Sequence, residues 1–134
     1  MDFSITPKQK EIIDLARTIA QEEIKPASLA IDKSGVIPEG LMRILKQSGM
    51  TALAVPKEYG GAGQDVLSYA IAVEELSRVD GGTGVILSAH VSLGSWPIFA
   101  FGTEEQKQKW LTHWLLSQFL SGVMKNRSRP GVIR

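Results

Sequence analysis

The apolar positions of the chain recur mainly at helical spacing, beginning close to the N-terminus. Thr6 and Pro7 form a helix start, with Thr6 as the N-cap, Pro7 in the first helical position and Gln9 as a capping-box partner. The apolar residues that follow are spaced i, i+3, i+4 and predict one buried stripe: Ile12, Leu15, Ala16, Ile19 and Ala20. Because Pro26 lacks an amide hydrogen, this helix is expected to end or kink near it.

Further helical segments follow, separated by glycine and proline residues. They are expected at about 27–33, 38–48, 66–79, 83–95 and from 103 onward, with a strand-like connector at 50–55. On the helix over 66–79, the predicted buried face holds Tyr69, Ala70, Val73 and Leu76. The helix over 83–95 is apolar on nearly all sides and is predicted to be the central one. The pattern as a whole predicts an all-α bundle of about six helices.

Composition limits the chemistry that the chain can perform. Its 134 residues are 43% apolar and 22% charged, as expected for a chain that folds around one core. There are no cysteines, which excludes disulfides and thiolate nucleophiles, and two histidines make a His-rich metal site unexpected. The N-terminus has neither the basic nor the apolar region of a signal peptide, so a cytoplasmic location is expected. Residues 85–101 include a proline and are predicted to form a buried helix rather than a membrane span.

The charges are distributed unevenly along the chain. Residues 1–111 hold all 14 acidic residues and 11 of the 15 basic ones, a net charge of −3. Residues 112–134 hold four basic residues and no acidic one. Four positive charges without an amphipathic design do not predict contact with nucleic acid or a membrane. The chain therefore consists of an acidic body, 1–111, and an aberrant basic tail, 112–134, which need separate explanations.

Candidate catalytic groups are few. The glycine run at 60–63 lacks the lysine and hydroxyl residues of a P-loop and is predicted to be a tight connector. Glu74 and Glu75 diverge by about 100° on a helix, so one carboxylate is expected to point inward and the other into solvent. Ser88 and His90 point apart on their helix and do not form a catalytic pair. The residues themselves predict no catalytic group.

His90 and the tryptophans have structural explanations and functional ones. His90 is either a hydrogen-bonded core histidine or a residue that faces a cavity. The residues around His90 are small: Ser88, Ala89, Ser92, Gly94 and Ser95. They favour close packing between helices, and a ligand cavity is the alternative. Trp96 and Trp110 are predicted to be anchors of the core or of an interface.

Four sequence blocks resemble one known family. They are Val-Pro-Lys-Glu-Tyr-Gly-Gly-Ala-Gly at 55–63, Val-Glu-Glu-Leu-Ser-Arg-Val-Asp at 73–80, Leu-Ser-Ala-His-Val-Ser-Leu-Gly at 87–94 and Phe-Gly-Thr-Glu-Glu-Gln-Lys at 101–107. Their order and spacing resemble the N-terminal helical domain of the flavin-dependent acyl-CoA dehydrogenases over residues 1–111. The third block is most similar to the short-chain, butyryl-CoA branch.

The resemblance implies an oxidoreductase of fatty acid metabolism. In that family a glutamate removes the α proton of an acyl-CoA while a hydride moves to FAD, and an electron-transferring flavoprotein reoxidises the flavin. The family's enzymes are homotetramers, and their FAD site and glutamate base belong to later domains. The resemblance therefore implies no catalytic residue and no bound FAD in residues 1–134. It implies that this domain closes one side of the acyl-chain cavity, with Ile86, Leu87 and His90 as lining residues.

The resemblance stops at about residue 112. Read from the third base of the Thr112 codon, the following bases can encode the Pro-Leu-Ala that the family has there. In the same frame, the codons of 127–133 can encode Glu-Pro-Ala-Gly-Ser-Asp, which resembles a later family motif with one residue missing. The tail is therefore interpreted as a frameshift product. The residues after Gly122 are expected to be disordered. The apolar residues before it are expected to extend the last helix: Trp114, Leu115, Leu116, Phe119 and Leu120.

Two functional hypotheses follow from the sequence. In the first, the chain is the N-terminal part of an acyl-CoA dehydrogenase and is inactive by itself. In the second, it is a stand-alone helical module that uses this domain to bind another protein.

Overall fold

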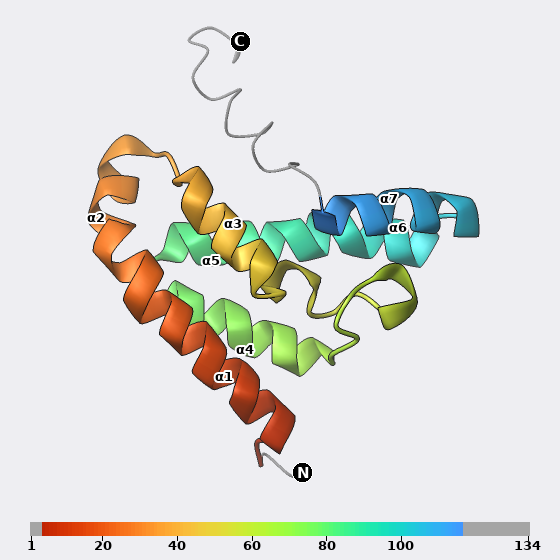
Figure 1. Cartoon of the computed structure of the whole chain (residues 1–134), viewed down its shortest axis with the longest axis horizontal. Coiled ribbons are helices and arrows are strands. Elements are labelled where there is room, and N and C mark those ends of the chain that lie inside the picture. Colours follow the sequence, from red (N-terminus) through yellow and green to blue (C-terminus); the bar gives the residue numbers. More distant parts are fainter. Residues whose placement is uncertain (1–3, 117–134) are drawn as a thin grey trace, which may run out of the picture.

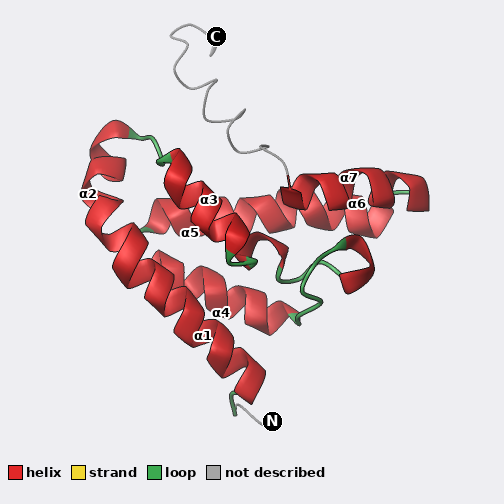
Figure 2. Ribbon diagram, in the orientation of Figure 1, coloured by secondary structure: helices red, strands yellow, loops and turns green. Residues whose placement is uncertain are grey.

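The computed structural model describes residues 4–116, and all of their regular structure is helical (Figures 1 and 2). Within these residues there are seven α-helices, α1 to α7, and the longest connection is residues 48–65 between α3 and α4. Their bounds are Pro7–Ile19, Lys25–Ser34, Glu39–Gln47, Val66–Ser77, Gly81–Ala89, Trp96–Phe101 and Glu104–Leu116. The prediction of an all-α fold is confirmed. The helix that starts near residue 103 reaches Leu116, as expected, whereas the predictions for Phe119, Leu120 and the residues after Gly122 lie outside the described residues.

One hydrophobic core holds the bundle together. Helix α1 packs along α4, α4 packs along α5, and α3 contributes Leu41 and Leu45 to the same core (Figure 1). From α5 and the turn that follows it, Leu87 and Val91 point into this core. A smaller cluster joins Val55 and Tyr59 to Leu111 on α7. The connection over residues 50–52, predicted to be strand-like, is instead a 3-10 turn with Met50 and Thr51 buried.

Each of two prolines, Pro26 and Pro97, follows a π-helical turn through which one α-helix continues into the next. Pro26 follows a π-helical turn at Ala20–Ile24, where the amide of Lys25 bonds to the carbonyl of Ala20, five residues earlier. Pro97 follows a second one at His90–Ser95, closed by a bond from the amide of Trp96 to the carbonyl of Val91. A proline ring collides with the carbonyl four residues before it, and a widened turn moves that carbonyl aside. The prediction that the first helix ends or kinks near Pro26 corresponds to this π turn between α1 and α2. The prediction of a helix end at Ser95 is wrong, because the helix continues to Phe101.

On two helices the predicted buried face includes one exposed residue, while the other predicted positions are buried or half-buried. On α1, Leu15 is exposed while Gln9 is buried, because the Gln9 amide donates to Asp65 at 3.2 Å on the neighbouring α4 cap. On α4, Ala70 is exposed, and Ile71 and Ala72 point into the core. Both helices have neighbours that cover more than one face, so the apolar pattern alone does not determine the buried side.

The ion pair between Arg17 and Glu75 joins α1 to α4. The guanidinium donates from Nη2 to Oε1 at 2.8 Å and from Nε to Oε2 at 3.1 Å. Glu75 is buried, and its hydrogen bond with Arg17 lowers the pKa of the carboxyl below its ordinary value of 4.5. Glu74 points outward to Arg78. The prediction that one of these two carboxylates points inward is confirmed.

Glu75→Gln is expected to lower the free energy of unfolding at neutral pH by about 1 kcal/mol, because it removes the charge from a two-bonded contact. A carboxyl whose pKa is depressed by folding stabilises the fold above its unfolded pKa, and that contribution is lost as the pH falls through the folded pKa. The difference between the wild type and the variant should therefore be constant near pH 7 and shrink below about pH 4.5. Urea unfolding at several pH values measures it.

Glu74→Gln is the matched control, because Glu74 forms its ion pair in solvent on the same helix. It should change the stability by less than about 0.5 kcal/mol at neutral pH. Equal effects of the two substitutions would contradict the structural role of Glu75.

Candidate functional site

The glycine-rich connector at residues 55–63 uses its amide groups within its own fold. The amides of Gly61, Ala62 and Gly63 donate to the carbonyls of Pro56, Ala52 and Val55, at 3.1, 3.0 and 2.8 Å. Gly60 and Gly63 have positive φ angles of 87° and 60°, which glycine adopts without strain. Because these amides are already paired, they are not available to hold a phosphate. The connector is a tight turn, as the sequence predicts.

Tyr59 fastens this connector to the start of α7. Its hydroxyl donates to Glu104 Oε2 at 2.8 Å, and its ring meets Phe99 edge-on, with centroids 6.1 Å apart. The hydrogen bond to Glu104, followed by burial, raises the pKa of Tyr59 to about 12. Lys107 lies over the other ring of the pair, with Nζ 5.6 Å from the Phe99 centroid. Tyr59, neutral at physiological pH, holds the connector against α6 and α7, which is a structural role.

The three residues predicted to line an acyl cavity lie on α5 and the turn after it. Leu87 is 1% exposed and belongs to the core, while Ile86 is half-buried against that core. His90 is 3% exposed, and burial, with a smaller contribution from Lys46, lowers its pKa to about 4. The imidazole is therefore neutral at physiological pH. The structure places these residues on one helix, and two of the three point into the domain itself.

The outer side of the same helix is open. The stretch Gly81–Phe101 runs through α5, the π turn and α6, and its exposed side carries Val85, Leu93 and Phe101 at 66%, 78% and 87% exposure. Trp96 and Trp110 are each about half-exposed, so they are not core anchors. The prediction of a buried, central helix therefore holds for the side that carries Leu87 and Val91, and it is wrong for the opposite side. Its pattern could not show that one face has no neighbour within residues 4–116.

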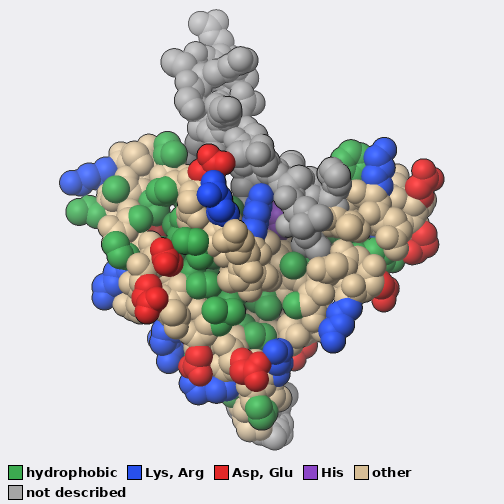
Figure 3. All heavy atoms as spheres, viewed as in Figure 1, with side chains coloured by type: hydrophobic (Ala, Val, Ile, Leu, Met, Phe, Trp, Pro, Cys, Tyr) green, Lys and Arg blue, Asp and Glu red, His purple; other side chains and the backbone are tan. Residues whose placement is uncertain are grey.

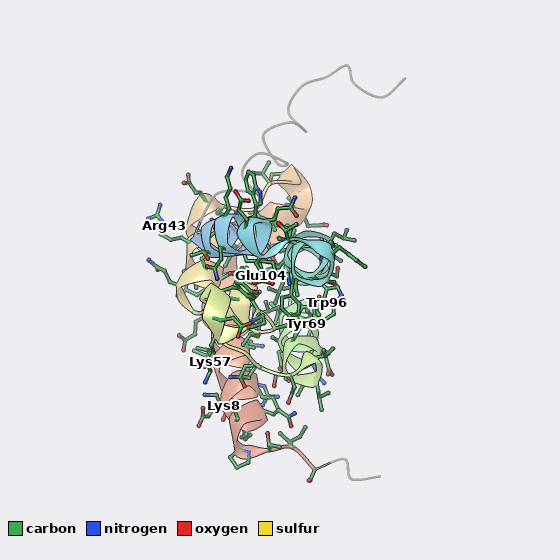
Figure 4. All side chains as sticks on the ribbon, turned by 90° about the vertical axis from the view of Figure 1, so that its right-hand side faces the viewer. Lys8, Arg43, Lys57, Tyr69, Trp96 and Glu104 are labelled. Atoms are coloured by element: carbon green, nitrogen blue, oxygen red, sulfur yellow. The ribbon has the colours of Figure 1, made fainter. Side chains whose placement is uncertain are left out.

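The polar groups beside this open face are small hydroxyls. Figure 4 shows Tyr69 in the space between α4 and the α5–α6 helix, and its hydroxyl donates to the Ser88 carbonyl at 3.1 Å. Ser92 Oγ donates to the same carbonyl at 2.7 Å. Gly84 approaches α4 so closely that a Cβ there would lie 1.9 Å from Ser77 Oγ. Small residues therefore serve close helix packing at Gly84, and they border the open face at Ser88 and Ser92.

The described residues enclose little space. One apolar cavity of about 10 Å³, the size of one water, lies between Val55 and Phe99. A shallow groove of about 340 Å³ lies between α6 and α7. Within residues 4–116 no group of three His, Asp or Glu side chains is close enough to hold a metal ion. Gly81–Phe101 also has the length and the mean hydropathy, 1.4, of a membrane span, a property shared by core helices of globular proteins.

These observations define a class of protein: a helical domain with a complete core and one long apolar helix face left open for a neighbour. A family comparison matches residues 6–116 to the acyl-CoA dehydrogenase N-terminal domain, and the chain belongs to that family.

Several relatives that this chain resembles are short-chain acyl-CoA dehydrogenases. The chain is 51% identical over 111 residues to the short-chain-specific acyl-CoA dehydrogenase of Clostridium acetobutylicum, covering 83% of this chain and 29% of that protein. It is 43% identical over 101 residues to the human mitochondrial short-chain enzyme, covering 75% of this chain and 24% of that one. Butyryl-CoA dehydrogenase of Megasphaera elsdenii has a similar structure, with a TM-score of 0.81 at 39% identity over 86% of this chain.

A chain in a structure of the electron transferring flavoprotein of Acidaminococcus fermentans matches similarly, with a TM-score of 0.80 at 48% identity, over 84% of this chain and 30% of that one. The match to the Megasphaera enzyme covers 31% of that protein. The chain thus spans about 30% of the length of the relatives that it matches.

Proposed function

We propose that this domain is the N-terminal helical part of an FAD-dependent dehydrogenase that oxidises a short-chain acyl-CoA between its α and β carbons. The open apolar face of Gly81–Phe101 carries this proposal. Leu93 and Phe101 are exposed to water in this domain, which is unfavourable for apolar side chains. Burying each of them against a neighbouring domain would stabilise the protein by about 2 kcal/mol. The relatives extend well beyond the matched region and offer such a neighbour.

In the proposed enzyme, the α5–α6 helix forms one wall of the acyl-chain cavity. Ile86, Leu87 and His90 are the residues proposed for this wall from the sequence. Leu87 and His90 support the wall from inside the domain, since both are buried in this structure. The outward positions that sequence reasoning passed over are Val85 and Ser92, which border the open face directly.

The side chains at three helix starts of this domain argue against an FAD site of its own. A flavin pyrophosphate needs unpaired backbone amides, usually at a helix N-terminus. The N-termini of α4 and α5 are closed by Asp65 and Asp80, whose carboxylates accept from Ser68 and Thr83 at 2.6 Å. Thr103 and Gln106 close the start of α7 in the same way. We therefore place FAD, the glutamate base and the flavoprotein partner with the remainder of the proposed enzyme, whose tetrameric state follows the family. The cytoplasmic location is proposed from the N-terminal sequence alone.

The tail at 112–134 is proposed to be a frameshift product of that enzyme's gene. This rests on the codon freedom of residues 112–115 and 127–133, which can encode family motifs in one shifted frame. The coding DNA tests it. If the shifted frame does not continue into a β domain and a helical bundle with a glutamate base, the frameshift proposal fails.

The purified 134-residue chain is expected to show no flavin absorbance near 450 nm and no butyryl-CoA-dependent dye reduction, with or without added FAD. The control is butyryl-CoA dehydrogenase from Megasphaera elsdenii, assayed in the same way. Flavin turnover by the isolated chain would contradict its proposed inactivity. Tight binding of one defined protein by the flavin-free chain would instead support the stand-alone interaction module.

A further inference from the structure

Helices α4 and α5 are in close contact at one end of their interface. A Cβ added to Gly84 on α5 would lie 1.9 Å from Ser77 Oγ and 2.9 Å from Ser77 Cβ on α4. Toward the start of α4, Tyr69 lies in the space between α4 and the α5–α6 helix (Figure 4). A glycine at one end and an aromatic side chain at the other indicate that the two helices diverge from Gly84 toward Tyr69.

The Tyr69 ring is held in this space by Ser88 on α5. Its hydroxyl donates to the Ser88 carbonyl at 3.1 Å, and Ser88 Oγ lies 3.3 Å from it. The ring packs against the edge of the hydrophobic core and is partly exposed. Ser92 Oγ donates to the same carbonyl at 2.7 Å, and Ser92 is exposed on the open face. The ring of Tyr69 therefore lies beside the residues that border the open face.

The other side of α4 does not suit an apolar ligand. Helix α1 packs along it, and the ion pair between Arg17 and Glu75 joins the two helices. Figure 3 shows charged side chains of both signs over α1. An apolar chain that reaches α4 is therefore expected to do so where α4 meets α5, next to Tyr69.

We propose that Tyr69 is a specificity-determining residue whose ring fills the space between α4 and α5 and so limits the depth of the acyl-chain cavity. This inference rests on the proposed function, in which the α5–α6 helix is one wall of that cavity. A short acyl chain ends before the ring, whereas a longer chain has to enter the space that the ring occupies. Because the hydroxyl is bonded to Ser88, moving the ring aside would also cost a hydrogen bond.

A purely structural role for Tyr69 would have a different consequence. Loss of stability lowers the amount of folded enzyme, and it does so equally for every substrate. The ratio of the kcat/KM values for two acyl-CoA substrates does not depend on the enzyme concentration, which cancels. That ratio therefore separates an effect on cavity depth from an effect on stability.

The test uses a chimaera in which the 111 aligned residues of this chain replace their counterparts in the short-chain-specific dehydrogenase of Clostridium acetobutylicum. Tyr69→Ala removes the ring. It is expected to raise the ratio of kcat/KM for octanoyl-CoA to that for butyryl-CoA by about 30-fold, mainly through a lower KM for octanoyl-CoA. Tyr69→Phe keeps the ring and loses the hydrogen bond, and it should raise the ratio by about fivefold.

Tyr59→Phe is the matched control. The Tyr59 hydroxyl also donates to a partner on another helix, Glu104 at 2.8 Å, but Tyr59 belongs to the connector and not to the contact of α4 with α5. This variant should leave the ratio unchanged within about twofold. If Tyr69→Ala holds no FAD, Tyr69→Leu replaces it, because leucine keeps an apolar side chain against the core without the ring. The expected rise is then about tenfold.

The outcomes separate this inference from the proposed function. An unsubstituted chimaera that holds FAD but does not turn over butyryl-CoA contradicts the proposed function and this inference with it. A chimaera that is active with butyryl-CoA, and whose ratio is unchanged when the Tyr69 ring is removed, overturns the inference about Tyr69 alone. A ratio that rises as much in Tyr59→Phe as in Tyr69→Phe overturns it as well.

Discussion

Gly61→Ala is expected to lower the free energy of unfolding by about 3 kcal/mol. An added Cβ at this position would lie 2.0 Å from the carbonyl oxygen of Val55 and 2.4 Å from its carbonyl carbon. Both are backbone atoms, and that oxygen already accepts the amide of Gly63 at 2.8 Å. The connector would have to open, which would release the contacts of Tyr59 with α7. Urea unfolding followed by circular dichroism measures the change.

Gly40→Ala is the control for this substitution. Gly40 lies in α3, and a Cβ there meets nothing within 4 Å. Alanine should stabilise the helix by about 0.5 kcal/mol, because glycine loses more backbone entropy on folding. If Gly61→Ala is as harmless as Gly40→Ala, the closed form of the connector described here is incorrect.

Leu87→Ala is expected to cost about 3 kcal/mol of stability, because it empties a volume in the centre of the core. Leu87 is 1% exposed and belongs to the cluster that unites α1, α3, α4 and α5. Val85→Ala, two residues earlier on the open face, should change the stability of the isolated chain by less than about 0.5 kcal/mol. Chemical denaturation of the two variants under identical conditions gives both values.

The contrast between these two variants determines which side of α5 belongs to the domain core. Comparable losses at Leu87 and Val85 would mean that the helix is buried on both sides. A loss at Val85 alone would reverse the assignment of the open face.

Local sequence signals predicted the helix starts well. The capping box of Thr6 and Gln9 is present, with both reciprocal hydrogen bonds, because all its atoms belong to one short segment. The same holds for Thr103 and Gln106 at the start of α7. The inward position of one carboxylate at 74–75 also followed from helix geometry, although its partner, Arg17, lies 58 residues away and could not be found from spacing.

Other features depend on surroundings that a single sequence does not contain. Pro26 predicts an end or a kink in the helix, but the sequence does not show that a π-helical turn precedes both Pro26 and Pro97 and accommodates each proline ring. Leu87 and Leu93 are equally apolar, so composition cannot show that one enters the core and the other faces outward. Ile86, Leu87 and His90 therefore remain a prediction from the sequence, and the outward position of Val85 required the structure.

The most direct test of the central claim is a chimaera with the short-chain-specific dehydrogenase of Clostridium acetobutylicum. The 111 aligned residues of this chain, 51% identical, replace their counterparts at the N-terminus of that enzyme. If this domain is the helical part of a short-chain acyl-CoA dehydrogenase, the folded chimaera should hold FAD and reduce a dye with butyryl-CoA at a rate within about tenfold of the parent enzyme. A chimaera that folds and holds FAD but shows no butyryl-CoA turnover would contradict the account.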